Sequence, residues 1–106
     1  MDWRSELKVN GFLQFGDFII ELVYVDCPCD TIPPILAVYD AKTGEWYRVD
    51  ETPPTINNYT EAWTWAVDVL ERFIEGEQPK LVGLDGPAPE DVIERFLKAL
   101  RNLPKG

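Results

Sequence analysis

Two stretches of the chain alternate β-branched and aromatic residues with other side chains, and each is interrupted by a turn sequence. The first spans residues 9–25 and breaks at Gly16 and Asp17, and the second spans residues 35–51 and breaks across residues 40–44. This pattern is typical of a β-hairpin, because strand side chains alternate with a period of two and Gly and Asp favour tight turns. The sequence therefore predicts two consecutive hairpins in one antiparallel sheet.

The two hairpins differ in how their second strands are expected to be covered. Residues 18–25 carry one charged side chain, Glu21, so we expect this strand to be central and covered on much of both faces. Residues 45–50 place Trp46, Arg48 and Asp50 on one face and Tyr47 and Val49 on the other. Because neither face is uniformly apolar, the pattern predicts an edge strand.

The second half of the chain carries two helical patterns. Asn58 and Glu61 stand three residues apart, as in a capping box that opens a helix, and Gly76 is placed to end it. The apolar residues of this helix form one broad stripe: Ala62, Trp63, Ala66, Val67, Val69, Leu70, Phe73 and Ile74. A last helix is expected from Pro89, with an apolar face made of Val92, Ile93, Phe96, Leu97, Leu100 and Leu103.

Two shorter segments complete the prediction. Residues 2–8 are expected to form a short helix capped by Asp2, and residues 80–84 form a candidate short strand. Strands followed by helices indicate an α+β fold. We expect a single domain over residues 1–106, with a small antiparallel sheet of two hairpins (four to five strands) packed against two C-terminal helices and a short N-terminal helix.

The charge of the chain restricts its partners. It has 19 acidic and 10 basic residues, a net charge of -9, within a composition that is 45% hydrophobic and therefore typical of a folded domain. Nucleic acids and anionic membranes bind through Lys and Arg, so neither is expected as a direct ligand. An acidic surface instead favours a protein partner with a basic surface.

The N-terminal residues do not resemble a targeting segment. They lack the basic region and the apolar stretch of a secretory signal, and residues 18–25 are far too short to span a membrane. We therefore expect a cytoplasmic protein, in the host cytoplasm if a phage encodes it.

The segment from Asp26 to Asp30 contains the two cysteines, Cys27 and Cys29, on either side of a proline. A zinc site usually needs four Cys or His ligands, and the chain has no histidine. A disulfide between these cysteines would close a small, strained ring. We interpret the segment as a stiff turn, with a metal shared across an oligomer and a redox pair as the alternatives.

The absence of histidine also restricts catalysis, because His is the commonest acid or base near neutral pH. Phosphate-binding glycine motifs are absent as well, so we expect no cofactor. The catalytic alternative is a small hydrolase or lyase that uses paired carboxylates, helped by Tyr24, Tyr39 or Tyr59.

Aromatic residues among acids indicate where a partner would bind. Trp63 belongs to the helix stripe, whereas Trp65 is expected on its polar flank, and Trp46 and Tyr47 lie on opposite faces of one strand, so at least one should be near solvent. The predicted partner-binding residues are Asp40, Glu45, Trp46, Tyr47, Asp50, Glu51 and Trp65.

These features predict a small acidic, non-catalytic binding protein that inhibits or modulates a basic, nucleic-acid-handling protein. Anti-CRISPR proteins of phages and immunity proteins are examples of that class. An accessory subunit of a larger complex and a homodimer are the other assemblies that the sequence allows.

Overall fold

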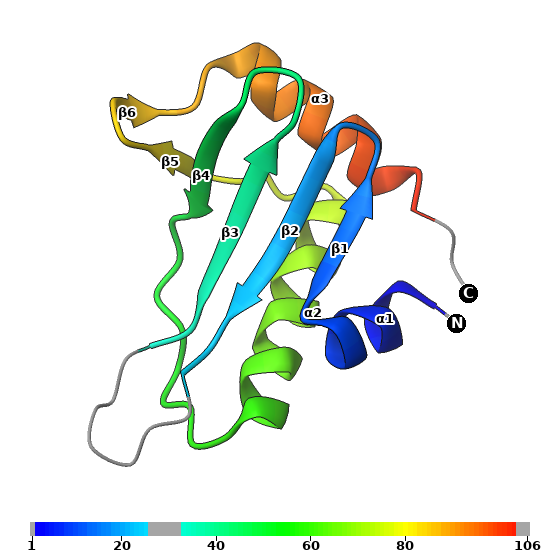
Figure 1. The fold of residues 1–106 in the computed structure, drawn as a ribbon, viewed down its shortest axis with the longest axis vertical. Helices are drawn as coiled ribbons and strands as arrows, with labels where there is room; N and C mark the ends of the chain where they lie inside the picture. The colour runs from blue at the N-terminus through cyan, green and yellow to red at the C-terminus, as the bar shows by residue number, and fades with distance from the viewer. Residues whose placement is uncertain (1, 26–32, 104–106) are drawn as a thin grey trace.

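The computed structural model describes residues 2–25 and 33–103, which form three helices and six strands (Figure 1). In chain order these are α1 (Trp3–Asn10), β1 (Phe12–Phe15), β2 (Phe18–Val23), β3 (Ile35–Asp40), β4 (Glu45–Val49), α2 (Tyr59–Glu75), β5 (Leu81–Gly83), β6 (Gly86–Pro87) and α3 (Glu90–Arg101). The predicted α+β class, the short N-terminal helix and the two C-terminal helices are confirmed.

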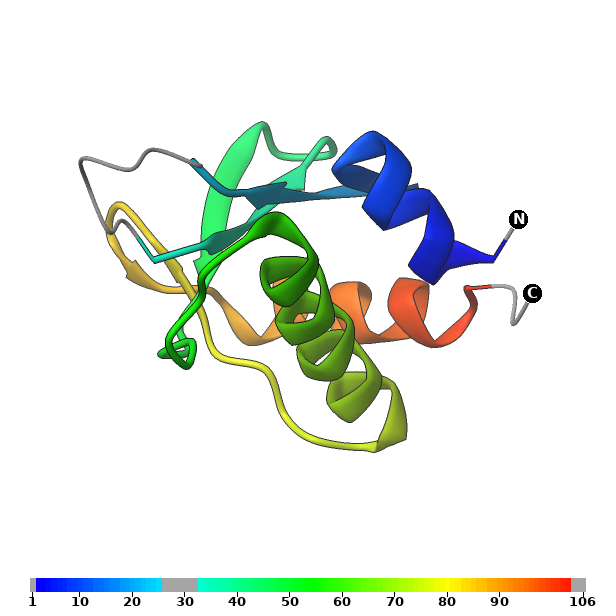
Figure 2. The ribbon, with the colours of Figure 1, turned by 90° about the horizontal axis from the view of Figure 1, so that it is seen from below.

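The six strands form one sheet in the order β1-β2-β3-β4-β5-β6, with every neighbouring pair antiparallel. Figure 2 shows α2 and α3 on the same side of this sheet. The prediction of four to five strands was one strand short, because residues after Leu81 fold back and pair as a further hairpin. Gly86, at φ 119°, closes that hairpin in a backbone conformation that a side chain would strain.

Two predictions about individual strands were wrong. β4 is not an edge strand, because Arg48 and Val49 pair with β5, so the sheet continues beyond it. β2 is central, between β1 and β3, but it is covered on one face only. Its residues Phe18, Ile20 and Leu22 are buried, whereas Val23 on the other face is 38% exposed.

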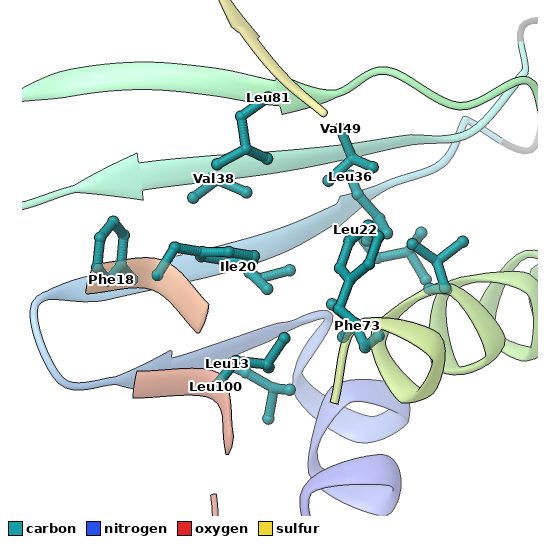
Figure 3. Close-up of a cluster of buried hydrophobic side chains, with 14 of the residues drawn as sticks. Leu13, Phe18, Ile20, Leu22, Leu36, Val38, Val49, Phe73, Leu81 and Leu100 are labelled. Carbon is teal, nitrogen blue, oxygen red and sulfur yellow. The ribbon is translucent and has the colours of Figure 1, made fainter. Parts of the chain in front are cut away.

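The buried hydrophobic side chains form one cluster between the sheet and the helices (Figure 3). Phe96 of α3 lies at its centre, with ring centroids 5.6 Å from Phe18, 5.9 Å from Phe15 and 6.5 Å from Phe73. Burying a side chain of this size contributes about 2 kcal/mol. One face of the sheet therefore supplies much of the stability of the fold.

Helix α1 is fixed to α2 by side chains of α2 that donate to its backbone. The hydroxyl of Tyr59 donates to the carbonyl of Lys8 at 2.8 Å, and the indole Nε1 of Trp63 donates to the carbonyl of Arg4 at 2.8 Å. The Arg4 guanidinium also pairs with Glu71 at 3.0 Å. These contacts occupy one flank of α2, and Trp63 lies on that flank.

The predicted capping box opens α2. The Asn58 side chain accepts a hydrogen bond from the Glu61 backbone N–H at 2.9 Å, and the Glu61 carboxylate accepts from the backbone N–H of Asn57 at 3.2 Å. The first-turn N–H groups of a helix otherwise lack partners inside it.

We expect Asn58→Ala to lower the free energy of unfolding by about 1 kcal/mol, because it removes the acceptor for the Glu61 N–H. Chemical denaturation measures this value. Asn102→Ala, at the C-terminal end of α3, is the control and should change stability much less. Equal stabilities of the Asn58 variant and the wild type would contradict the cap.

Candidate protein-binding surface

The side of the sheet that faces away from α2 and α3 carries the side chains that alternate with the buried ones. We call it the open face. Its side chains from β1 to β4 are Phe12, Gln14, Ile19, Glu21, Val23, Ile35, Ala37, Tyr39, Trp46 and Arg48. All of them are exposed or half-buried, whereas most of their neighbours along the strands are buried.

Large apolar side chains are exposed on each of these four strands. Phe12 is 46% exposed, Val23 38%, Ile35 40% and Trp46 51%. Scattered single apolar residues are normal on a protein surface, but a set on one face of one sheet is typical of an interaction site. The open face is therefore our candidate protein-binding surface.

Trp46 is the largest exposed aromatic residue of the open face. It pairs in register with Tyr39 of β3, and the two ring centroids are 4.8 Å apart. The contact restricts both rings, so less side-chain entropy is lost when a partner covers them. This confirms the expectation that at least one aromatic residue of the Trp46-Tyr47 pair lies near solvent.

Tyr47 points to the other side of the sheet and is half-buried. A Cβ atom added at Gly83 would lie 3.1 Å from the Tyr47 ring, which shows how closely β5 approaches it. Burial raises the pKa of Tyr47 above its ordinary value, with a smaller contribution from Glu45. Tyr47 therefore packs against the core on the helix-covered side of the sheet and does not belong to the open face.

The charged residues of this surface are mostly acidic. Asp50 follows Arg48 on the open face, with Oδ1 and Nη1 3.8 Å apart. Glu21 lies on the same face of β2, whereas Glu45, exposed at the start of β4, alternates with Trp46 and lies on the Tyr47 side of the strand. Glu21 and Arg48 lie in one row across the sheet with Phe12 and Ala37, between the Val23-Ile35 pair and the row that contains Tyr39 and Trp46. The open face therefore mixes apolar side chains with charges that could orient a partner.

The prediction that Asp40 contacts a partner was wrong, because Asp40 is 0% exposed. It is the last residue of β3 and points toward α3, where Arg95 Nη2 donates to Oδ2 at 2.7 Å and Nη1 to Oδ1 at 3.3 Å. The backbone N–H of Lys42 donates to Oδ1 at 3.1 Å. The hydrogen bond from Arg95 lowers the pKa of Asp40 and outweighs the opposite effect of burial.

The expected position of Trp65 was also wrong, whereas Trp63 packs against the core as its place in the stripe predicts. Trp65, expected on the polar flank, is 8% exposed and belongs to the buried face, whereas Trp63 is only partly buried. The stripe read from the sequence was broad because α2 has two neighbours, the sheet and α1. Trp63 faces α1, where Lys8 Nζ lies 4.6 Å from the centre of its ring.

A groove of about 550 Å³ runs between α2 and the segment that follows β4. Its lining consists of Glu51, Thr52, Pro54, Thr55, Ile56, Glu61, Thr64, Trp65, Asp68 and Arg72. We call it the Trp65 groove. It brings together Glu51 and Trp65, two of the predicted site residues, and Asp50 lines an adjacent hollow that shares Glu51 and Arg72.

The predicted site therefore divides into separate parts. Trp46 and Asp50 belong to the open face, and Glu51 and Trp65 belong to the Trp65 groove. Asp40, Glu45 and Tyr47 lie on the opposite side of the sheet, and of these three Glu45 alone is exposed. Sequence reasoning missed Phe12, Val23 and Ile35. Their alternation with buried residues was visible, but the pattern does not tell which face the helices cover.

Three expectations concern the cysteines, a metal site and membrane-spanning helices. Cys27 and Cys29, with their flanking aspartates, lie outside the described residues. Within residues 2–25 and 33–103, no three His, Cys, Asp or Glu side chains gather as they would around a metal ion. None of the helices in these ranges has the length and apolar character needed to cross a membrane.

Comparison with protein-family models, with curated proteins and with solved structures found no match to this chain.

Proposed function

We propose that this chain is a small acidic binding protein that docks through its open face on a basic, nucleic-acid-handling protein and inhibits or modulates it. The observation that carries this proposal is the set of exposed apolar side chains on one face of the sheet, with the Trp46 ring in contact with that of Tyr39. Tryptophan and tyrosine are enriched among the residues that dominate interface energetics.

The charge of the chain determines the kind of partner. With a net charge of -9, the chain repels acidic surfaces and attracts basic ones before contact is made. Glu21 and Asp50 place part of that charge on the open face. Carboxylates there would occupy Lys and Arg side chains that otherwise bind phosphates, which is how such a protein would inhibit a nucleic-acid-binding partner.

A second copy of the chain is a poorer occupant of the open face. Both copies would carry a charge of -9, so association has to overcome repulsion between like charges. A basic partner has the opposite electrostatic effect. We therefore assign the open face to a different protein, and a homodimer is an outcome that sedimentation of the purified chain would detect.

We do not propose carboxylate catalysis in the Trp65 groove. Glu51 and Asp68 both pair with Arg72, at 2.7 Å and 3.2 Å, and Glu61 accepts hydrogen bonds from the capping residues Asn57 and Asn58. Each acid thus has a structural partner. An anti-CRISPR or immunity protein would act instead by stoichiometric occupation of its target.

The test uses a partner captured from the cells that produce this chain. We expect Glu21→Lys/Asp50→Lys to slow association with it by roughly tenfold at low salt, because these exposed acids of the open face steer the encounter. The difference should shrink at ~0.5 M salt, where the Debye length is only a few ångström. Surface-immobilised kinetics at two salt concentrations measures both effects. Glu51 is left unchanged because it is held by Arg72.

The matched control is Glu75→Lys/Glu94→Lys, which makes the same change in net charge on the exposed helical side of the molecule. We expect it to change the association rate much less, since these residues lie across the molecule from the open face. If both double variants slow association equally, or if neither does, the assignment of the acidic docking surface is wrong.

A further inference from the structure

Trp65 lines the Trp65 groove and carries a hydrogen-bond donor without a partner among the described residues. Trp65 is 8% exposed, and its indole N–H donates to no other group in the part of the chain that the structure describes. No side-chain nitrogen sealed inside the described residues lacks a partner, so this N–H opens to solvent. An aromatic residue that is otherwise buried and keeps a free donor at a groove is suited to receive an acceptor such as a carbonyl oxygen.

The same groove has an excess of negative charge. The Arg72 guanidinium is shared by Glu51 at 2.7 Å, Asp68 at 3.2 Å and Glu77 at 2.7 Å. Only one oxygen of each of these carboxylates is used, so Oε2 of Glu51 and Oδ1 of Asp68 accept no hydrogen bond from the described residues. A second cation entering the groove would find acceptors ready for it.

The walls of the groove match the rest of such a ligand. Pro54 and Ile56, from the segment after β4, line the groove with apolar surface, and Thr64 of α2 adds an uncharged polar side chain. The volume of about 550 Å³ lies in the range of pockets that bury a ligand of a few hundred daltons. It suits a short extended peptide, whose aliphatic side-chain stem lies along the apolar wall.

We propose that the Trp65 groove binds an extended, arginine- or lysine-containing segment of the basic protein partner. A backbone carbonyl of the segment accepts the indole N–H of Trp65, and its cationic side chain pairs with the unused oxygens of Glu51 and Asp68, on the side away from Arg72. This proposal rests on the proposed function, because it assigns the segment to the same partner. It adds a second, sequence-selective contact to the one made by the open face.

The probe is the blocked tripeptide Gly-Arg-Gly, acetylated and amidated at its ends, titrated into the ¹⁵N-labelled protein. The indole cross-peak of Trp65 is identified by its loss in Trp65→Phe. We expect that cross-peak to shift with millimolar affinity. The same peptide with citrulline in place of arginine should bind roughly tenfold more weakly, because it keeps the shape and loses the charge.

Two variants locate the cation. We expect Asp68→Asn to weaken peptide binding by roughly tenfold, whereas the matched change Glu75→Gln, on the same helix and outside the groove, should leave it unchanged. Propylguanidinium has the cation and no peptide carbonyl, so it should bind more weakly and shift the Trp65 indole less.

Several results would overturn the proposal: equal binding of the arginine and citrulline peptides, shifts that avoid the Trp65 indole, or propylguanidinium binding as tightly as the peptide. So would partner binding that is unaffected by Asp68→Asn. These results are separable from a failure of the proposed function, because the peptide titration does not involve the open face. Loss of partner binding in open-face variants with no effect of groove variants would leave the proposed function standing.

Discussion

Replacing Arg95 by methionine is expected to lower the free energy of unfolding by about 3 kcal/mol, because it leaves the carboxylate of Asp40 buried without its cation. Asp40 is 0% exposed, and its carboxylate accepts hydrogen bonds from both terminal nitrogens of Arg95. In the variant, the carboxylate keeps only neutral donors, the backbone N–H of Lys42 and the side chain of Thr43. Small domains are stable by only about 5–15 kcal/mol, so the loss would be large.

The effect should depend on pH with a definite sign. The folded-state pKa of Asp40 is lowered, so its ion pair stabilises the fold above the unfolded-state pKa of about 3.9 and this contribution is lost as the pH falls through the folded-state pKa. The difference in stability between the wild type and Arg95→Met should therefore be fully present at neutral pH. It should shrink as Asp40 becomes protonated in acid.

Denaturant unfolding at neutral pH and near pH 3 measures both expectations. Lys98→Met, an exposed change on the same helix, is the control for loss of a positive charge. Arg95→Met/Asp40→Leu should recover part of the stability, because it removes the stranded carboxylate together with the cation. A loss below about 1 kcal/mol, or a loss that is the same at both pH values, would contradict the role of this pair.

Local signals in the sequence were sufficient for most of the elements. The capping residues of α2, the glycine at its end and the turns of the hairpins are short-range features, and the structure has them where the sequence predicts them. Trp3 and Leu7 of α1, four residues apart, are both buried as their spacing indicates.

The predictions that failed depend on contacts between distant segments. The acidic character of Asp40 suggested a surface position, and only the approach of Arg95, 55 residues later, explains its burial. Trp63 and Trp65 are two residues apart, and which of them faces the sheet depends on where α1 packs. For β4, the deciding event is the pairing of Val49 with Leu81, which a pattern along one strand does not contain.

Among the variants proposed here, Trp46→Ala is expected to weaken binding of the basic partner most. Trp46 is 51% exposed, so the substitution should lower the free energy of unfolding by no more than about 1 kcal/mol, through the lost contact with Tyr39. Binding of the basic partner should instead weaken by about 2 kcal/mol, the cost typical of a central aromatic anchor. That corresponds to roughly thirtyfold in the dissociation constant, mostly as a shorter lifetime of the complex.

The measurement that tests the open face most directly is the dissociation rate of this complex for the wild type, Trp46→Ala and Val9→Ala. Val9 is the control because it is 70% exposed and apolar but lies on α1, outside the sheet. The open-face proposal predicts dissociation roughly thirtyfold faster for Trp46→Ala and a rate close to that of the wild type for Val9→Ala. Unchanged dissociation of a correctly folded Trp46→Ala protein would contradict the proposal and place the partner on another surface.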